Sequence, residues 1–314
     1  MSSPSLDPRP TDRAHLEPLA PGQAPTPAPE PTRTPEPGAA ESALASTPAA
    51  DLPALRIAHL WPSLLNVAGD GGNVTAVEAR SRWRGIATQT VGYEAGDPVP
   101  DLTAFDIVFV QGGQDVEMTL VAADLPRVAG ALRDAADAGV VMLPVCAGLQ
   151  LLGHAYIPNV GPALEGAHVL DLETRGGSQR FMQHAACEVT IDGETETVVG
   201  FENHSGVTEL GPGAVPFGRV VAGAGNNGRD GHEGARRDNV FATYLHGPVL
   251  PKNPWLADML VRIAISRKAG APVVLGPLDD ALERRAHDVA LEKAMRNRGQ
   301  RTALTPARLH RKAS

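Results

Sequence analysis

From residue 55 onward, short apolar runs alternate with segments whose apolar residues recur at helical spacing. The runs predict four strands, at 55–61, 85–93, 105–113 and 139–145. The last two runs are apolar almost throughout, which is typical of strands buried on both faces of a sheet. Helical spacing at 72–84 and 117–139 fills two of the gaps, and Gly139 is placed to end the second helix.

Strands that alternate with helices favour right-handed crossovers and a mostly parallel sheet covered by helices on both faces. We therefore expect a three-layer α/β/α fold, with ligands at the carboxyl ends of the strands. The second half is richer in predicted strands, namely "AHVLDLET", "RFMQHAACEVTI", "TVVGFENHSG", "RVVAGAG" and "NVFATYLHG" at 239–247. Two more helices are predicted, at 254–270 and 277–298.

Proline marks one domain boundary, because 13 of the 28 prolines lie in residues 1–53, with few large apolar residues between them. Such a segment cannot bury enough surface to offset the entropy cost of ordering it. We predict a disordered, partly polyproline-like arm at 1–53, a single globular domain at 54–270, and a charged helix with a basic tail at 271–314. The tail is expected to be solvated, with a patch for anionic surfaces or a partner as the alternative.

Composition argues against several classes of protein. A net charge of -8 disfavours nucleic acid as the main partner. No apolar stretch reaches the roughly 18 residues that cross a membrane, and the start of the chain lacks the pattern of a secretory signal. The two cysteines, Cys146 and Cys187, are too few for a disulfide framework. We expect a cytoplasmic protein with Cys187 in its core.

Cys146 stands where the apolar run "VVMLPV" meets a helical segment that begins with Ala147 and Gly148. Small neighbours permit a sharp bend that raises the cysteine side chain above the sheet, as in a nucleophile elbow. The start of a helix adds partial positive charge, which favours the reactive thiolate. The alternative is a structural cysteine, because free cysteine is among the most buried residue types.

Two other predicted strand ends carry groups that suit a reactive thiol. The run at 239–247 places His246 at its end, where a strand of the same sheet would bring a base to the cysteine. In "VQGGQD", Gly112 and Gly113 expose backbone N–H groups that can stabilise an oxyanion. Either feature alone is weak, but a cysteine, a histidine and a glycine turn at neighbouring strand ends favour nucleophilic catalysis.

Six segments extend the pattern: "WPSLLNVAGDGGNV", "RSRWRGI", "GGQDVE", "PVCAGLQLLG", "GFENHSG" and "TYLHGPVLPKNP". Together they resemble the class I glutamine amidotransferases of the cobyric-acid-synthase-like branch, and within it the GatD subunits of lipid II isoglutaminyl synthase. The cysteine elbow is typical of the superfamily, while "GDGGN", "GFENHSG" and "LHGPVLPKNP" indicate the GatD group. The resemblance covers about residues 55–268.

The resemblance implies a glutaminase, in which Cys146 attacks the side-chain amide of L-glutamine, ammonia leaves, and water hydrolyses the glutamyl thioester. The ammonia would pass to a MurT-like, ATP-dependent ligase in a heteromer, and that partner would amidate the α-carboxyl of D-glutamate in lipid II during peptidoglycan synthesis. The chain itself would bind no ATP, no other cofactor and no metal. A lipid-linked acceptor leaves open action at the inner face of the membrane.

The resemblance also implies roles for single residues. Cys146 matches the nucleophile, His246 matches the base, and Gly113 with the amide of Ala147 matches the oxyanion hole. Arg180, in "GGSQRFMQ", lies where an arginine would hold the glutamine carboxylate, and a planar guanidinium suits that target; a surface ion pair is the alternative. Gln150, one helical turn after the cysteine, would contact substrate or serve packing.

One departure concerns the histidine. Many class I amidotransferases orient it with a glutamate two positions later, where this chain has Pro248. Asp70, Glu202 or a group of the partner could supply the carboxylate that fixes the tautomer. Asp70, like Asn73, is equally expected as a turn former. His204 is either near the mouth of the site or a satisfied loop histidine.

We further expect Asp70, Glu202 and His204 to form an open rim above Cys146, on which a partner docks. A metal site made of Cys146, His204 and His246 is disfavoured, because the paired spacing typical of such sites is missing.

Three functions remain open at this level. The first is the glutaminase subunit of a peptidoglycan-amidating synthase. The second is an amidotransferase subunit for another carboxylate, such as a corrinoid precursor. The third is a non-catalytic regulatory module that keeps the elbow for packing, against which the joint presence of cysteine, histidine, glycine turn and arginine argues.

Overall fold

The computed structural model describes residues 53–296. The predicted arm at 1–53, apart from Pro53, and the basic tail after residue 296 lie outside this range. None of the helices between residues 53 and 296 combines the length and apolar character that crossing a bilayer requires.

A six-stranded sheet forms the centre of the fold, in the order β11-β12-β4-β3-β1-β2. Its strands are β1 (Leu55–Leu60), β2 (Thr88–Tyr93), β3 (Ile107–Val110), β4 (Val141–Pro144), β11 (Ala235–Arg237) and β12 (Val240–Ala242). The first four and β12 run parallel, and β11 pairs antiparallel with β12. The four strands predicted for the first half are confirmed, each shorter than the run that predicts it.

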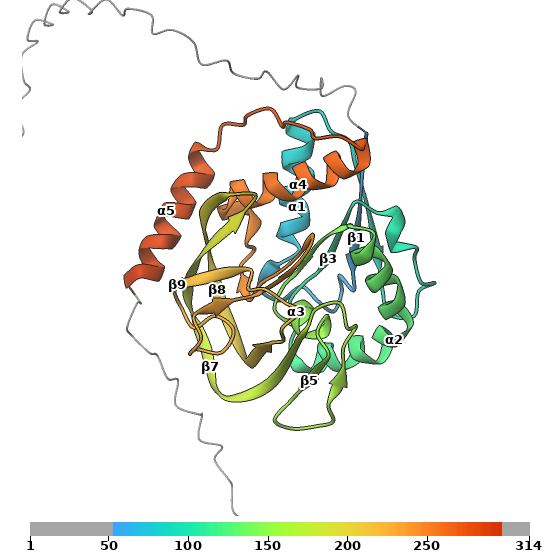
Figure 1. Cartoon of the computed structure of the whole chain (residues 1–314), viewed down its shortest axis with the longest axis vertical. Helices are drawn as coiled ribbons and strands as arrows, with labels where there is room; N and C mark the ends of the chain where they lie inside the picture. The colour runs from blue at the N-terminus through green and yellow to red at the C-terminus, as the bar shows by residue number, and fades with distance from the viewer. Residues whose placement is uncertain (1–52, 297–314) are drawn as a thin grey trace, which may run out of the picture. The chain divides into compact units, whose positions relative to one another are not determined.

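Helices cover both faces of this sheet. In the sheet order, β2 lies on one side of β1, whereas β4 lies on the opposite side of β3. Right-handed crossovers therefore place the two connecting helices, α1 (Gly72–Trp83) and α2 (Asp115–Asp137), on opposite faces of the sheet. Figure 1 shows α4 (Pro254–Ala269) beside α1, and α3 (Ala147–Leu151) contacts α2. The predicted α/β/α layering is confirmed. Gly139, with φ +73°, follows α2 and ends it as predicted.

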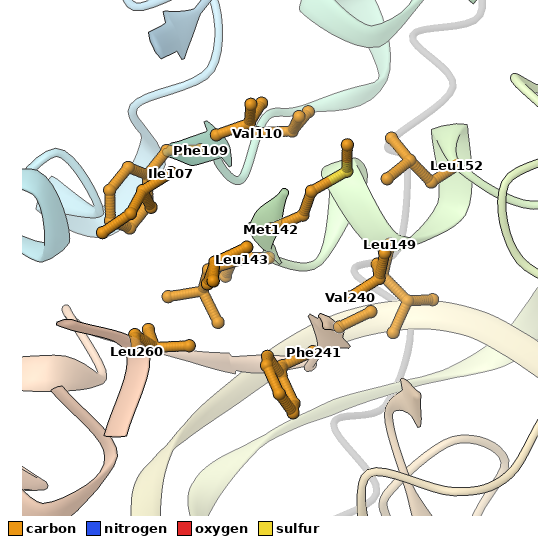
Figure 2. Close-up of a cluster of buried hydrophobic side chains, with 14 of the residues drawn as sticks. Ile107, Phe109, Val110, Met142, Leu143, Leu149, Leu152, Val240, Phe241 and Leu260 are labelled. Atoms are coloured by element: carbon orange, nitrogen blue, oxygen red, sulfur yellow. The ribbon is translucent and has the colours of Figure 1, made fainter. Parts of the chain in front are cut away.

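The core lies where the strands meet the helices. Every residue of β3 and β4 is buried. Side chains from β3, β4, β12, α3 and α4 join one cluster (Figure 2), which includes the fully buried Phe109, Leu143, Phe241, Leu149 and Leu260. Burial of one such side chain stabilises the fold by about 1.5–3 kcal/mol. The core therefore holds the carboxyl ends of β3 and β4 in a fixed relation.

A second sheet is built on a long antiparallel hairpin of β7 (Leu172–Ile191) and β8 (Glu194–Leu210). The pairing is irregular between Gly176 and Phe181. The remaining strands are β5 (Ala155–Ile157), β6 (Leu164–Glu165), β9 (Gly218–Ala222), β10 (His232–Glu233) and β13 (Leu245–His246). The predicted strands of the second half fall mostly into this hairpin and β9, and Cys187 is buried in it, as predicted.

The segment 239–247, predicted as one strand, is divided between the two sheets. Its first part, β12, joins the central sheet, whereas β13 pairs antiparallel with β8. The buried carboxylate of Glu233 holds the crossing point, because it accepts hydrogen bonds from Tyr244 N (2.7 Å) and the Thr243 hydroxyl (3.1 Å). The prediction that Cys146 and His246 come from strands of one sheet is therefore wrong.

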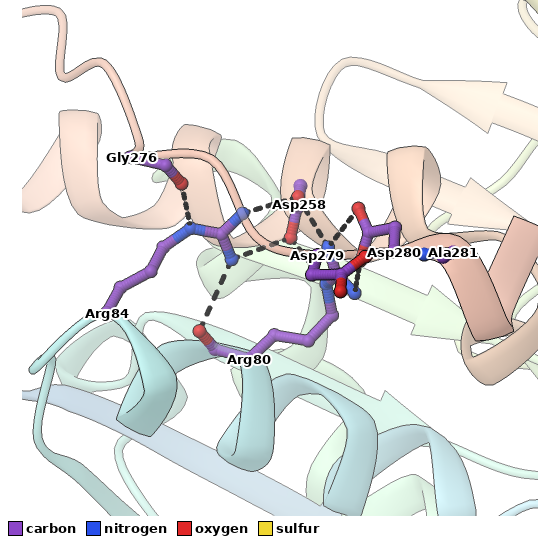
Figure 3. A network of polar contacts seen from close by, with 7 residues as sticks. All are labelled: Arg80, Arg84, Asp258, Gly276, Asp279, Asp280 and Ala281. Atoms are coloured by element: carbon purple, nitrogen blue, oxygen red, sulfur yellow. Dashed lines mark hydrogen bonds and ion pairs between the residues drawn. The ribbon is translucent and has the colours of Figure 1, made fainter. Parts of the chain in front are cut away.

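A partly buried ion-pair network ties the segment around Asp258 and Asp280 to α1 (Figure 3). Arg80 donates to both oxygens of Asp258 at 2.6 and 2.7 Å and to both oxygens of Asp280 at 2.7 and 3.0 Å. Arg84 also binds Asp258, at 2.6 and 2.9 Å. Just after Asp280, α5 (Ala281–Arg296) begins and packs two alanines against the second sheet.

Candidate active site

A cavity of about 370 Å³ takes its lining from both sheets. The turns after β3 and β4 contribute Gly113 and Cys146, while the second sheet contributes Arg180, His204 and His246. The other lining residues are Gln114, Asp115, Val116, Glu117, Met118, Gln150, Tyr156, Asn203, Ser205 and Gly206. Six sequence-predicted site residues, Gln150 among them, therefore meet in one cavity.

Cys146 occupies a sharp bend between β4 and α3, with φ +48° and ψ −97°. This is a conformation that residues other than glycine rarely adopt, and it matches the predicted elbow. A Cβ at Gly148 would collide with the carbonyl oxygen of Val110, so the bend requires glycine there. Because α3 has only five residues, its partial charge is a small influence on the sulfur, and a charged neighbour matters more.

That neighbour is His246, whose Nδ1 lies 2.7 Å from Oδ2 of Asp70. Both side chains are buried. Burial lowers the pKa of His246, but the charge of Cys146 and the hydrogen bonds to Asp70 and Cys146 outweigh it, so the pKa rises to about 10. Asp70 thus takes the place of the glutamate that Pro248 replaces.

The three residues expected to form an open rim are in fact buried. Asp70, Glu202 and His204 have relative exposures of 0%, 1% and 3%. Glu202 accepts hydrogen bonds from Gln183 Nε2 (2.6 Å) and from the amide of Ala224 (2.7 Å), so its carboxylate is engaged away from His246. The prediction of an open rim is wrong: Glu202 and His204 lie on β8, which pairs on one side with β7 and on the other with β13, and Asp70 packs against Gly112 and His246.

The stretch "GDGGN" forms a turn and also positions the site. The backbone N–H of Asn73 donates to the backbone carbonyl of Asp70 at 2.9 Å, and Oδ1 of Asn73 accepts from the backbone N–H of Leu250 at 2.9 Å. The two roles considered for Asp70 are therefore both present. Gly112 packs directly against the pair of Asp70 and His246. A Cβ at Gly112 would lie 2.5 Å from His246 Cε1 and 2.7 Å from Asp70 Oδ2, so the pair requires glycine there.

The amides of Gly113 and Ala147 flank the cysteine from two strand ends. A Cβ built on Gly113 would lie 3.8 Å from the Cβ of Ala147, which shows that the two turns are adjacent. Ala147 begins α3, and the first N–H groups of a helix have no partner inside it. Between residues 53 and 296, neither N–H donates to a protein acceptor. Both remain available for an oxyanion.

Arg180 lies in the irregular stretch of β7 and is exposed. Its Nε donates to Asn203 Oδ1 at 2.9 Å, and no carboxylate of residues 53–296 forms an ion pair with it. The terminal nitrogens of the guanidinium are therefore free to bind an anion in the cavity. Gln150 also lines the cavity and is buried, and its Nε2 donates to the Tyr244 hydroxyl at 3.1 Å.

His204 is a strand residue in β8, and not a loop histidine. Its ring stacks on Tyr244 at 3.7 Å, and Nδ1 donates to Gly206 O at 2.9 Å. Burial lowers the pKa of His204 to about 3, so the ring is neutral and Nε2 is an acceptor. Nε2 has no partner among the described residues. No group of three or more His, Cys, Asp or Glu in 53–296 is placed to hold a metal.

Sequence reasoning missed two residues of the cavity region. Tyr244, two positions before His246, binds Gln150 through its hydroxyl and His204 through its ring. In the sequence it lies among apolar residues and is indistinguishable from an ordinary strand residue. Glu117 lines the cavity at the first turn of α2, where acidic residues usually stabilise a helix start. The motif "GGQDVE" contains Glu117, but nothing in the motif alone separates a helix-capping carboxylate from a ligand.

Comparisons with known proteins find one matching family and several similar proteins. Residues 56–254 match the family of CobB/CobQ-like glutamine amidotransferase domains. The lipid II isoglutaminyl synthase (glutamine-hydrolyzing) subunit GatD of Staphylococcus aureus (strain N315) is 35% identical over 79% of this chain and 99% of that protein. The same subunit of Streptococcus pneumoniae (strain ATCC BAA-255 / R6) is 37% identical over 73% of this chain and 87% of that protein.

A probable cobyric acid synthase of Methanosphaerula palustris (strain ATCC BAA-1556 / DSM 19958 / E1-9c) is 33% identical over 48% of this chain and only 30% of that protein. The likeness thus extends over nearly the full length of the first relative but over a minor part of the synthase.

Proposed function

Since the chain belongs to the CobB/CobQ-like glutamine amidotransferase family, and within it to the GatD subunits, we propose that it is the glutamine-hydrolysing subunit of a lipid II isoglutaminyl synthase. The observation that supports this most directly is the arrangement of Cys146, His246 and Asp70 at one cavity. A thiol, a histidine that can hold its proton, and a carboxylate that orients the histidine are the parts that amide hydrolysis requires.

In the first half of the proposed reaction, the Cys146 thiolate attacks the side-chain carbonyl carbon of L-glutamine. Negative charge develops on the carbonyl oxygen, which the amides of Gly113 and Ala147 stabilise. The His246 imidazolium donates its proton to the leaving nitrogen, the C–N bond breaks, and ammonia departs. The products of this half are the glutamyl thioester on Cys146 and a neutral His246.

In the second half, water attacks the thioester while His246 accepts a proton from it. The C–S bond breaks, L-glutamate leaves, and the thiolate–imidazolium pair is restored. The net reaction converts glutamine and water into glutamate and ammonia. Arg180 would hold the α-carboxylate of the substrate throughout, because its guanidinium faces the same cavity and has no ion-pair partner among the described residues.

The ammonia needs an acceptor, and the relatives are named as subunits of a synthase. We therefore propose a heteromer with a MurT-like ligase that uses ATP and amidates the α-carboxyl of D-glutamate in lipid II. On this proposal the chain described here supplies ammonia and holds neither ATP nor a metal, and its action would take place where the ligase meets its lipid-linked acceptor.

The test combines the chain with its MurT-like partner, lipid II, ATP and either glutamine or ammonium, and follows the acceptor by mass. Cys146→Ala should reduce glutamine-dependent amidation by at least about a thousandfold, because no nucleophile remains. Ammonium-dependent amidation should persist, since that chemistry belongs to the ligase. Cys187→Ala is the matched control, because Cys187 is a core residue outside the cavity, and it should keep both activities.

Near-normal glutamate release by Cys146→Ala would contradict the catalytic assignment. If the wild-type pair leaves lipid II unamidated but amidates a corrinoid or other carboxylic acid, the acceptor proposed here is wrong and the alternative from the cobyric acid synthase likeness is favoured.

A further inference from the structure

Glu117 is a charged residue of the cavity that the proposed reaction does not use. It lies in the first turn of α2 and lines the same cavity as Cys146. Its Oε2 is buried and has no hydrogen-bond partner among residues 53–296. Burial of a carboxylate oxygen without a donor is costly, so a carboxylate kept at this place in the cavity wall favours a role for its charge in binding a ligand.

The charge on Glu117 complements that of Arg180, which lines the same cavity and forms no ion pair with the described residues. Arg180 and Glu117 thus bring opposite charges to one cavity, and neither forms an ion pair with residues 53–296. The α-carbon of a free amino acid carries a carboxylate and an ammonium together. This pairing of charges suits the zwitterionic end of glutamine better than it suits a substrate with only a carboxylate.

Stabilisation of the helix start is an insufficient explanation for Glu117. Asp115, in the same turn, already supplies a negative charge there, and it is exposed and close to the Tyr156 hydroxyl, at 3.5 Å. An interaction with the helix dipole is effective at the surface and gives no reason to bury Oε2 of Glu117.

His204 Nε2 is a second unpartnered acceptor in the lining. A neutral imidazole nitrogen accepts one hydrogen bond from any donor, whereas a carboxylate adds charge attraction to an ammonium. Glu117 therefore suits the ammonium better than His204 does. The two candidates can be told apart, because substrate discrimination should be lost on substitution of whichever residue binds the ammonium.

We propose that Glu117 binds the α-ammonium of L-glutamine and so restricts the enzyme to glutamine with a free amino group. This inference rests on the glutaminase function proposed above and adds a specificity-determining residue to it. Glutaramate, which has the same side-chain amide and carboxylate but no amino group, should be a poor substrate for this reason alone.

The experiment measures kcat/KM for L-glutamine and for glutaramate, with the full chain in complex with its ligase. A hydrogen bond to a charged group should give the wild type about a 10- to 100-fold preference for glutamine. In Glu117→Gln the preference should fall to within a few-fold, mainly through a higher KM for glutamine, while the value for glutaramate stays nearly constant. Asp134→Asn, at an exposed position of the same helix and outside the cavity lining, is the matched control and should keep the wild-type preference.

A preference that survives in Glu117→Gln overturns the inference, and so does a preference that is lost only in His204→Gln. Glu117→Asp keeps the charge on a shorter side chain, so its preference for glutamine should lie between those of the wild type and Glu117→Gln. If Glu117→Gln folds poorly, Glu117→Asp gives an independent test. A wild-type complex that hydrolyses neither compound would instead refute the proposed function, and with it this inference.

Discussion

Asp70 and His246 are 176 positions apart in the sequence, yet the Oδ2 of Asp70 accepts a hydrogen bond from Nδ1 of His246 across 2.7 Å. The bond fixes the orientation of the ring and leaves Nε2 as the nitrogen for proton exchange with the cysteine. The second oxygen of Asp70 accepts from the Gly247 amide at 3.2 Å, which holds the carboxylate itself in place. Asp70 is thus a positioning residue for His246.

Asp70→Asn should lower kcat for glutamine hydrolysis by about 10²- to 10⁴-fold, because the amide favours the wrong orientation or tautomer of His246. The KM should change little, since Asp70 is absent from the cavity lining. Initial rates over a range of glutamine concentrations test this, with the melting temperature as the control for folding. An unchanged kcat in a folded Asp70→Asn variant would contradict the positioning role.

The same variant should change the pH dependence. In the wild type, burial lowers the pKa of His246, but Cys146 and Asp70 raise it by more, so the pKa is about 10. The imidazolium that protonates the leaving amide nitrogen is therefore lost only near that pH. Without the charge of Asp70 the pKa must fall, so the alkaline limb of kcat/KM should move to lower pH. A limb that stays in place, or moves upward, would refute the assigned cause.

Gly112→Ala should inactivate the enzyme with little loss of secondary structure. The new Cβ would lie 2.5 Å from His246 Cε1 and 2.7 Å from Asp70 Oδ2, so the pair must separate. Gly130→Ala is the matched control, because it lies inside α2 with nothing within 4 Å of the new Cβ. That control should keep full activity and gain about 0.5–1 kcal/mol of stability, since alanine favours a helix interior. Glutamate release and chemical denaturation measure both effects.

Arg80→Ala should lower the free energy of unfolding by up to about 3–5 kcal/mol, because it leaves the Asp280 carboxylate without its cation and leaves Asp258 with Arg84 alone. Arg82→Ala, two positions away on the same helix and exposed, should change it by less than about 0.5 kcal/mol. Denaturant titrations of the two variants make the comparison. Equal effects would mean that the network in Figure 3 contributes no more than a surface charge.

The predicted boundary near residue 53 is tested by truncation. A chain that begins at Leu52 should fold, hydrolyse glutamine and melt at essentially the same temperature as the full chain, if the proline-rich segment makes no stabilising contacts. A drop of several degrees would place the boundary elsewhere.

The sequence by itself determined the elements that have a local cause. Runs such as 105–113 and 139–145 predict buried strands because side-chain alternation and apolar composition act within a few residues. The bend at Cys146 is predictable for the same reason, since it needs only a strand, small residues and a helix start. The family resemblance likewise depends on short motifs that read directly from the chain.

Only the tertiary structure decided which distant groups meet. Glu233 holds the crossing between β12 and β13, so His246 reaches Cys146 from the second sheet, and no local pattern in 239–247 marks that crossing. The choice of Asp70 over Glu202 as partner of His246 depends on strand register and on what Glu202 binds instead. Local periodicity encodes the burial of each element, whereas contacts between elements follow from how their buried faces pack together, which the chain specifies only as a whole.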